Sequence, residues 1–298
     1  MLPSTHQPRT QRLSRITSTC GSRQRTSVNR CVLTQPQAEM AYHRIMVSID
    51  VNSDLGESYG VWTLGDDATM FSIVTSANVA CGFHAGDPSV LRATCTLAVE
   101  NGVAIGAQVS YPDLPGFGRR HLDMAPDELR DAVLYQLGAL DAFAQVAGGE
   151  VAYVKPHGAL YHTTATHPAA AEALVAAAAE YDPSLAILGL PGSELLAAAD
   201  AAGLESVPEA FADRAYRPDG GLVSRRESGS VLTDPDEVAE RAVRIATDNE
   251  VMAVDGTVVS IRARSICVHG DTPGAVGLAR AVRTALDAAG VGVYRFTS

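Results

Sequence analysis

Apolar and polar positions alternate in blocks along residues 45–298. Short apolar runs of β type, such as residues 103–108 and 151–154, are followed by segments with helical periodicity, whereas the first run, residues 45–51, leads into a loop that contains Trp62. The clearest helix is predicted over residues 123–147, where apolar side chains recur on one face. Further strands are predicted within residues 71–81, 185–190, 205–216 and 265–271, with a hairpin over 251–261 and a closing strand over 291–296. This alternation predicts a parallel sheet with helices outside it.

The polar residues of this pattern cluster where the predicted strands end. The clusters lie at residues 52–57, 78–87, 155–157, 209–214 and 269–271. In parallel α/β folds the reactive groups gather beyond the carboxyl ends of the strands. We therefore expect a distorted (β/α) barrel with one active-site mouth. An open doubly wound sheet is the alternative.

Residues 1–44 differ from the rest of the chain. They hold seven Arg, one acidic residue, Glu39, and no apolar periodicity. We therefore predict a disordered Arg-rich arm over residues 1–44 and a single catalytic barrel domain over residues 45–298. The arm has the composition of an organelle transit peptide, but a mis-assigned start, with Met40 or Met46 as the true one, is the interpretation we favour.

Net charge and apolar content exclude several classes of function. The whole chain carries −11 and the arm +6, so the barrel domain carries −17 and lacks the basic footprint of a nucleic-acid-binding protein. No apolar run has the length of a membrane span or a signal core, so we expect neither. The five cysteines are an odd number without paired spacing, which favours reduced thiols in the cytoplasm.

One lysine stands among 23 basic residues, and it lies at a strand end as Lys155-Pro156-His157. Lys differs from Arg in being a compact ammonium whose pKa shifts readily on burial, which suits catalysis or close contact with a small anion. The alternative is a strand-end lysine whose ammonium extends to water.

The other strand-end residues have structural interpretations too. Asp54 could cap a turn, Asp87 before Pro88 has the pattern of a helix N-cap, and Asp213 and Arg214 could form an ion pair. The histidines of the Gly-rich turns could be satisfied by backbone groups. Such residues gathered at one mouth nevertheless favour a functional site.

Common catalytic motifs are missing from the sequence. A phosphate-binding Gly-x-x-x-x-Gly-Lys-Ser/Thr loop is impossible, because the lysine is followed by Pro156, and no Gly-x-Gly-x-x-Gly follows a strand. His-Glu-x-x-His and Gly-x-Ser-x-Gly are missing as well.

Six blocks of the chain, in the right order, resemble the signature blocks of the LamB/YcsF family. They are residues 50–57, 76–87, 116–120, 154–161, 211–216 and 267–271. The resemblance covers the chain from about residue 45 to its end and implies a deformed (β/α)7 barrel similar to polysaccharide deacetylases. It also implies hydrolysis of 5-oxo-L-proline (pyroglutamate) to L-glutamate, coupled to ATP cleavage, in a complex with subunits B and C.

The implied chemistry explains the need for ATP and for partners. A five-membered lactam is resonance-stabilised, and phosphorylation of its oxygen would make the carbonyl carbon reactive toward water. Because the chain lacks a recognisable phosphate loop, we expect ATP, as Mg-ATP, to be bound with or by the partner subunits. Apart from subunits B and C and the small substrate, we expect no nucleic-acid or membrane partner.

We assign roles to the strand-end residues on this basis. General acid–base catalysis is expected from Asp54, His84 and His157, and anion binding from Lys155 and Arg214. The remaining residues expected to contact the substrate are Asn52, Glu57, Asn78, Asp87, Glu209, Asp213, His269 and Asp271.

No tightly bound metal is expected. Many members of the family have Gly-Ala-His-Pro after the third strand, and the related deacetylases hold a divalent metal with an Asp and two His. This chain has Gln108 there, and a neutral amide is a weak zinc ligand. Asp54 and His84 would remain, with His121 or His157 as substitutes from another loop, and Gln108 is expected to hydrogen-bond substrate or water.

Two other functions stay open at this stage. One is a stand-alone metal-dependent deacetylase or amidase of carbohydrate-like substrates. The other is a regulatory binding protein, which has less support because an inert binder needs few titratable groups at one mouth.

Overall fold

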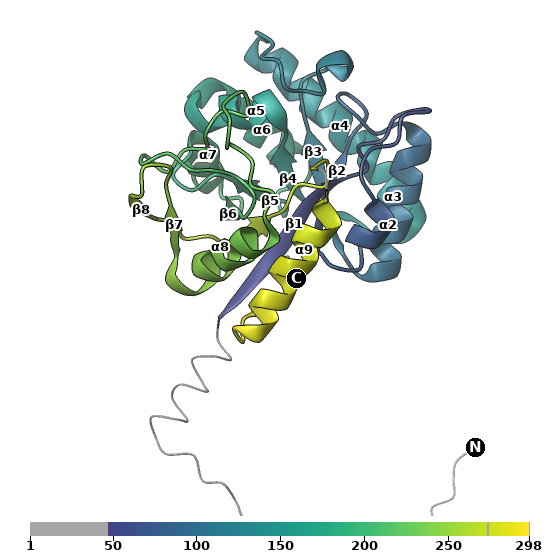
Figure 1. Ribbon diagram of the computed structural model, residues 1–298. Helices are drawn as coiled ribbons and strands as arrows, with labels where there is room; N and C mark the ends of the chain where they lie inside the picture. The colour runs from purple at the N-terminus through teal and green to yellow at the C-terminus, as the bar shows by residue number, and fades with distance from the viewer. Residues whose placement is uncertain (1–46, 273, 298) are drawn as a thin grey trace, which may run out of the picture.

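Seven parallel strands form a closed barrel in the computed structural model, which describes residues 47–272 and 274–297 (Figure 1). The strands are β1 (Ser48–Leu55), β2 (Ser76–Ala80), β3 (Ala104–Val109), β4 (Val151–Pro156), β5 (Ala186–Gly189), β6 (Ser206–Phe211) and β9 (Ser265–Cys267). Each pairs with the next in this order, and β9 pairs with β1 to close the ring. The predicted (β/α)7 barrel is therefore confirmed and the open sheet is wrong. The arm predicted over residues 1–44 lies outside the described residues.

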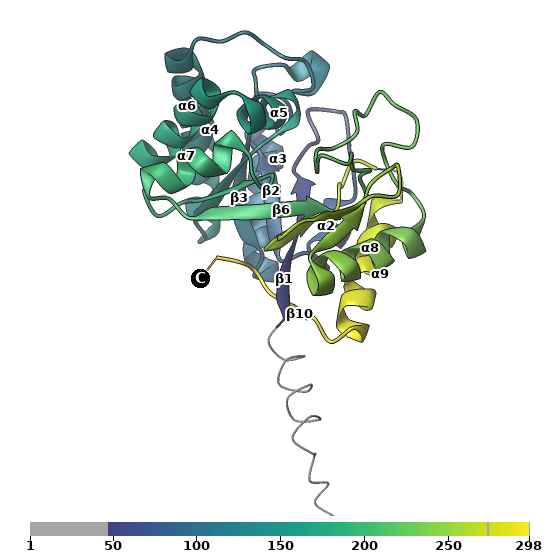
Figure 2. The same cartoon turned by 90° about the vertical axis from the view of Figure 1, so that its left-hand side faces the viewer.

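Helices follow the strands along the chain and cover the outside of the barrel (Figures 1 and 2). They are α2 (Asp67–Met70), α3 (Pro88–Asn101), α4 (Pro126–Ala147), α5 (Gly158–Thr166), α6 (Pro168–Tyr181), α7 (Glu194–Ala202), α8 (Pro235–Asp248) and α9 (Ala275–Ala288), with a short 3₁₀ turn at Leu114–Gly116. Their apolar faces and the strands bury the main core. Within the described residues, no helix is both long and apolar enough to cross a membrane.

The smaller predicted elements are present with shorter bounds. The hairpin is the antiparallel pair β7 (Glu250–Met252) and β8 (Val258–Ser260), and the closing strand is β10 (Gly292–Val293), which pairs with β1. Helix α5 was not predicted, because its sequence has almost no amphipathic periodicity. This helix begins directly after His157 and forms one wall of the mouth.

The interior of the barrel is filled by an aromatic ring and by a buried hydrogen-bonded carboxylate. The Tyr153 ring occupies the space that Gly106 leaves open, since a Cβ at Gly106 would lie 2.1 Å from that ring. Across the interior, Asp50 accepts hydrogen bonds from the hydroxyl groups of Thr75, Ser76 and Ser265. The barrel is thus a packed core in its lower half, and the polar strand ends lie above it.

Candidate active site

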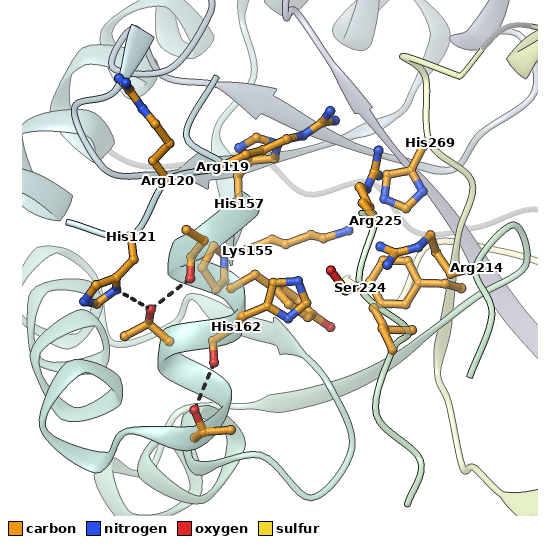
Figure 3. A pocket seen from close by; sticks show the side chains of 18 of the residues that line it. Arg119, Arg120, His121, Lys155, His157, His162, Arg214, Ser224, Arg225 and His269 are labelled. Carbon is orange, nitrogen blue, oxygen red and sulfur yellow. Dashed lines mark hydrogen bonds between the residues drawn. The ribbon is translucent and has the colours of Figure 1, made fainter. Parts of the chain in front are cut away.

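A cavity of about 790 Å³ opens at the carboxyl ends of the barrel strands (Figure 3). Five of the residues expected at the site line it: Asp54, Lys155, His157, Arg214 and His269. They come from β1, from β4 and the residue that follows it, and from the loops after β6 and β9, so segments far apart in sequence meet at one mouth.

Lys155 lies at the floor of the cavity with its ammonium among carboxylates. The side chain is 4% exposed, and Nζ lies 2.9 Å from Glu209 Oε2 and 3.5 Å from Asp54 Oδ1. Burial alone would lower the pKa of Lys155, but Cys267, Glu209 and Asp54 surround the ammonium and raise the pKa well above its usual range. The alternative of a lysine that extends to water is wrong. Two carboxylates balance its charge inside the fold.

Asn52 and Asn78 hold this group together from below. Asn52 Oδ1 accepts from Lys155 Nζ at 3.1 Å and from Asn78 Nδ2 at 2.7 Å. Asn78 Nδ2 also donates to Asp54 Oδ1 at 2.8 Å, and Tyr153 Oη donates to Asn78 Oδ1 at 2.7 Å. Both amides and Glu209 are fully buried and lie below the cavity lining, where they orient Asp54 and Lys155.

Asp54 is an ionised carboxylate at the edge of this network. Burial alone would raise the pKa of Asp54, but Lys155, His269 and His157 lower it well below its usual value. A carboxylate held in the charged form is a weak proton acceptor but a fixed negative charge for a cationic or hydrogen-bonding partner.

A second buried group contains Glu57, His84, Gln108 and His157. Gln108 Nε2 donates to Glu57 Oε1 at 3.0 Å, and His84 Nε2 lies 3.1 Å from Gln108 Oε1. The rings of His84 and His157 stack with centroids 4.2 Å apart. Burial lowers the pKa of His84 to about 4, and burial together with His84 lowers that of His157 well below its usual range. Both rings are therefore neutral near pH 7.

The ligand atoms of Glu57, His84 and His157 lie within 4.8 Å of one another, close enough for all three to reach one metal ion. This set differs from the one considered from the sequence, because Asp54 is turned toward Lys155 and Asn78 instead. Gln108 joins two members of the set through its amide, and the Nδ1 atoms of both rings have no hydrogen-bond partner among the described residues. The set is the one place in the described residues where such ligands converge.

His269 and Asp213 form a dyad at the opposite wall. His269 Nδ1 lies 2.9 Å from both carboxylate oxygens of Asp213, and the His269 backbone N–H donates to the same carboxylate. Burial alone would raise the pKa of Asp213, but His269 outweighs it and lowers the pKa. Because Asp213 holds the proton on Nδ1, Nε2 is the ring atom left to accept a proton on the cavity side.

Arg214 is a buried cation without a buried counter-charge. It is 3% exposed, and its guanidinium donates to the carbonyl oxygens of Ser230 and Val223. Among the residues that the structure describes, no carboxylate lies within ion-pair distance of it. Burial, followed by repulsion from Arg225, lowers the pKa of Arg214 to about 10. The interpretation of Asp213 and Arg214 as an ion pair is wrong, because Asp213 binds His269 instead.

Two glycines bring the loop after β3 to the cavity. Gly158 has φ +60°, and a Cβ there would lie 2.4 Å from the Gly118 carbonyl oxygen. The same carbonyl accepts from the Ala159 backbone N–H at 2.8 Å. This close contact places Arg119 at the rim, where it pairs with Asp271.

Asp87 lies outside the cavity lining. Its carboxylate caps α3 by accepting from the backbone N–H groups of Ser89 and Val90, and it also accepts from that of Gly60. The N-cap pattern with Pro88 at the first helical position is therefore confirmed.

The sequence interpretation missed most of the arginines at the mouth. Besides Arg214, the cavity is lined by Arg119, Arg120, Arg217, Arg225 and Arg226. The first two lie in the Gly/Pro-rich loop after β3, which was too long for a simple connection. The adjacent Arg225 and Arg226 were a readable signal in the polar loop before α8.

Comparisons with known proteins agree with this architecture. A sequence profile described as the LamB/YcsF family matches residues 49–298. A Streptomyces coelicolor protein, named as the A subunit of 5-oxoprolinase, is 60% identical over 248 residues, which cover 83% of this chain and 99% of that protein. The protein of the same name from Mycolicibacterium gilvum is 58% identical over 252 residues, covering 85% and 100%. The crystal structure of a lactam utilization protein from Thermus thermophilus superposes with a TM-score of 0.80 at 45% identity, covering 84% and 100%.

Proposed function

The chain belongs to the LamB/YcsF family, and from this premise we propose that it hydrolyses the cyclic amide of 5-oxo-L-proline to give L-glutamate. Two relatives that are 60% and 58% identical over the aligned residues are named as the A subunit of 5-oxoprolinase. The observation that supports the proposal most directly is at the cavity: His269, held by Asp213 behind it, and Arg214, a buried guanidinium without a counter-charge, line the same mouth. A lactam acid has an amide for the dyad to act on and a carboxylate for the guanidinium to bind.

The dyad supplies the general base. With its Nδ1 proton held by Asp213, His269 accepts the proton of the attacking water at Nε2 and later returns it to the leaving ring nitrogen. This assignment differs from that made from the sequence, in which Asp54, His84 and His157 were the expected general acid–base residues. His84 is fully buried behind His157 and lines no part of the cavity, so it acts through the stacked His157 ring.

Arg214 holds the carboxylate of the substrate. Its guanidinium lies at the wall of the cavity near His269, and a carboxylate there would supply the counter-charge that the fold does not (Figure 3). Lys155, whose positive charge is already compensated by two carboxylates, keeps Asp54 in place and ionised at the cavity floor.

Turnover requires ATP and partner subunits B and C. The lactam needs activation, and the sequence has no recognisable phosphate loop, so Mg-ATP is bound with or by the partners. The three described cysteines, Cys81, Cys95 and Cys267, are buried free thiols, which supports a cytoplasmic location.

The proposal is tested by glutamate release from 5-oxo-L-proline with the purified chain, with and without subunits B and C and Mg-ATP. Release is expected only in the complete mixture, and Asp213→Asn is expected to lower kcat by about 10²- to 10⁴-fold through loss of general-base catalysis. Arg130→Ala, which removes an exposed ion-pair partner of Glu180, is the matched control and keeps full activity. Absence of release from the complete mixture would refute the proposal.

The Glu57, His84 and His157 set supports a second candidate, a stand-alone metal-dependent deacetylase or amidase. If a metal were bound, these residues would hold it, and the metal would polarise a carbonyl or activate water. Deacetylation of an acetylated sugar by the purified chain, without ATP and after addition of zinc, would favour this candidate over the first.

A further inference from the structure

The arginines of the chain are concentrated at one place. Six of the fifteen arginines after residue 44 line the cavity, although the same part of the chain carries −17. Asp54 is the one carboxylate among the described residues that line it, and Lys155 already neutralises it. A cationic mouth on an otherwise acidic protein attracts anionic ligands to that one place.

These arginines differ in how their charge is balanced. Arg120 pairs with Asp113, and Arg217 with Asp219. Arg119 and Arg225 instead share one carboxylate oxygen, Asp271 Oδ2, with Arg225 at 3.7 Å.

Arg226, next in the chain, makes no ion pair within the described residues. The three guanidinium groups thus have a single carboxylate, that of Asp271, within ion-pair distance of any of them, which leaves two positive charges unbalanced. Arg214, deeper in the wall, is a separate unbalanced charge that the substrate carboxylate accounts for.

The cavity is also larger than a lactam acid requires. Pockets for drug-sized ligands measure roughly 300–1,000 Å³, and this cavity is about 790 Å³. A single five-membered ring with one carboxylate leaves room at the rim, where the unbalanced arginines lie.

We propose that Arg119, Arg225 and Arg226 form a phosphoryl-binding subsite at the rim, adjacent to the place where Arg214 holds the lactam acid. A phosphoryl group carries about two negative charges near pH 7, which match the two unbalanced positive charges. Arg119 comes from the loop after β3, and Arg225 and Arg226 come from the loop before α8. Guanidinium groups suit the phosphoryl oxygens, because each can donate two parallel hydrogen bonds. The phosphoryl group is carried either by the activated lactam or by a nucleotide. This inference rests on the proposed function for the position of the lactam.

The experiment is calorimetric titration of the full chain with inorganic phosphate at low ionic strength. Arg119→Ala and Arg225→Ala are each expected to weaken phosphate binding by about 10-fold, the effect of losing one charge-assisted contact. Each variant leaves Asp271 with its other arginine, so neither strands a buried charge. Arg130→Ala is the control and binds phosphate as the wild-type chain does.

Asp271→Asn separates the subsite from a general loss of structure. Asp271 competes with phosphate for Arg119 and Arg225, so its replacement is expected to strengthen phosphate binding by about 10-fold. Equal phosphate affinity in all four variants and the wild type, or no binding at all, would overturn the inference. Glutamate release by the assembled complex is measured separately, so loss of the subsite proposal and loss of the proposed function give different results.

Two further titrations identify the source of the phosphoryl group. If 5-oxo-L-proline raises the affinity for phosphate, the two ligands occupy adjacent positions and the activated lactam is the source. If the non-hydrolysable nucleotide Mg-AMP-PNP binds, displaces phosphate and loses affinity in Arg225→Ala, a nucleotide is the source. Either result supports the subsite, provided that the arginine variants weaken it.

Discussion

The floor and the rim of the cavity both contain several charged side chains, but the two regions differ in how far these charges are compensated within the fold. At the floor, Lys155 lies between the carboxylates of Glu209 and Asp54, so its positive charge is compensated within the fold. At the rim, Arg119 and Arg225 share a single carboxylate of Asp271. A charge compensated inside the protein orients its neighbours, whereas a charge that the fold leaves uncompensated is available to an anionic ligand. The difference assigns structure to the floor and recognition to the rim.

Replacement of Lys155 should have the largest effect, because it breaks the balance at the floor. Lys155→Met leaves Glu209 and Asp54 as buried carboxylates without a cation, which costs about 3–5 kcal/mol of unfolding free energy. Urea denaturation followed by circular dichroism measures the loss. Arg130→Ala, with its exposed pair, should change the unfolding free energy by less than about 1 kcal/mol.

Lys155→Arg tests the same balance with the charge retained. The wider guanidinium cannot take the position of an ammonium that contacts Asn52, Glu209 and Cys267 together, so glutamate release should be largely lost while the fold persists. Near-full activity of this variant would show that a positive charge suffices at the floor.

Asp50 tests the cost of a carboxylate with no cation beside it. Burial, only partly offset by hydrogen bonds from Ser265, Ser76 and Thr75, raises the pKa of Asp50 to about 6. The folded state therefore binds its proton more tightly than the unfolded state, and this contribution is complete below about pH 4 and is lost as pH rises through about 6. The shift corresponds to about 3 kcal/mol.

Asp50→Asn removes the titration and keeps the shape. The unfolding free energy of the variant relative to wild type should thus rise by up to about 3 kcal/mol between pH 4 and pH 8. Denaturation curves at the two pH values give this difference directly. A constant difference across that range would mean that Asp50 is not protonated in the folded protein.

In the cavity wall below the rim, replacement of Arg214 should affect substrate binding more than stability. Arg214→Ala should raise the KM for 5-oxo-L-proline by about 10- to 100-fold, because a charge-assisted contact to the substrate is lost. The unfolding free energy should fall by less than about 2 kcal/mol, since the variant loses hydrogen bonds to two backbone carbonyls and no ion pair. A large loss of stability with unchanged KM would place Arg214 with the floor.

The floor and the rim also differ in how much of each could be predicted from the sequence. Alternating apolar runs and helical segments predicted the barrel, and the lone lysine pointed to Lys155. The depth of each strand-end side chain was not predictable, because it depends on the register between strands. Asn52 and Asn78 belong to strand-end clusters like those of His157 and His269, yet the strands place these two amides below the cavity.

The rim was harder to predict for a different reason. Arg225 and Arg226 belong to a long loop without periodicity, and only its path across the mouth brings Arg225 to Asp271. Helix α5 was missed because its apolar and polar residues are not separated onto two faces. It is defined by the Gly158 turn against Gly118 and by packing, neither of which leaves a periodic pattern.

Metal content is where the smallest effect is expected. The Gln108 amide already forms hydrogen bonds with Glu57 and His84, which a metal would have to displace. Burial and the neighbouring Asp54 also raise the pKa of Glu57 well above its usual value, so a metal would have to remove any proton on that carboxyl. We therefore expect substoichiometric zinc in protein purified without chelator, and unchanged glutamate release after EDTA once Mg-ATP is restored. Gln108→His adds a third imidazole beside Glu57 and His84, and should convert the set into a site that retains zinc through gel filtration. One equivalent of zinc in the wild-type chain, with activity that only a transition metal restores, would instead make the buried histidines the centre of the reaction.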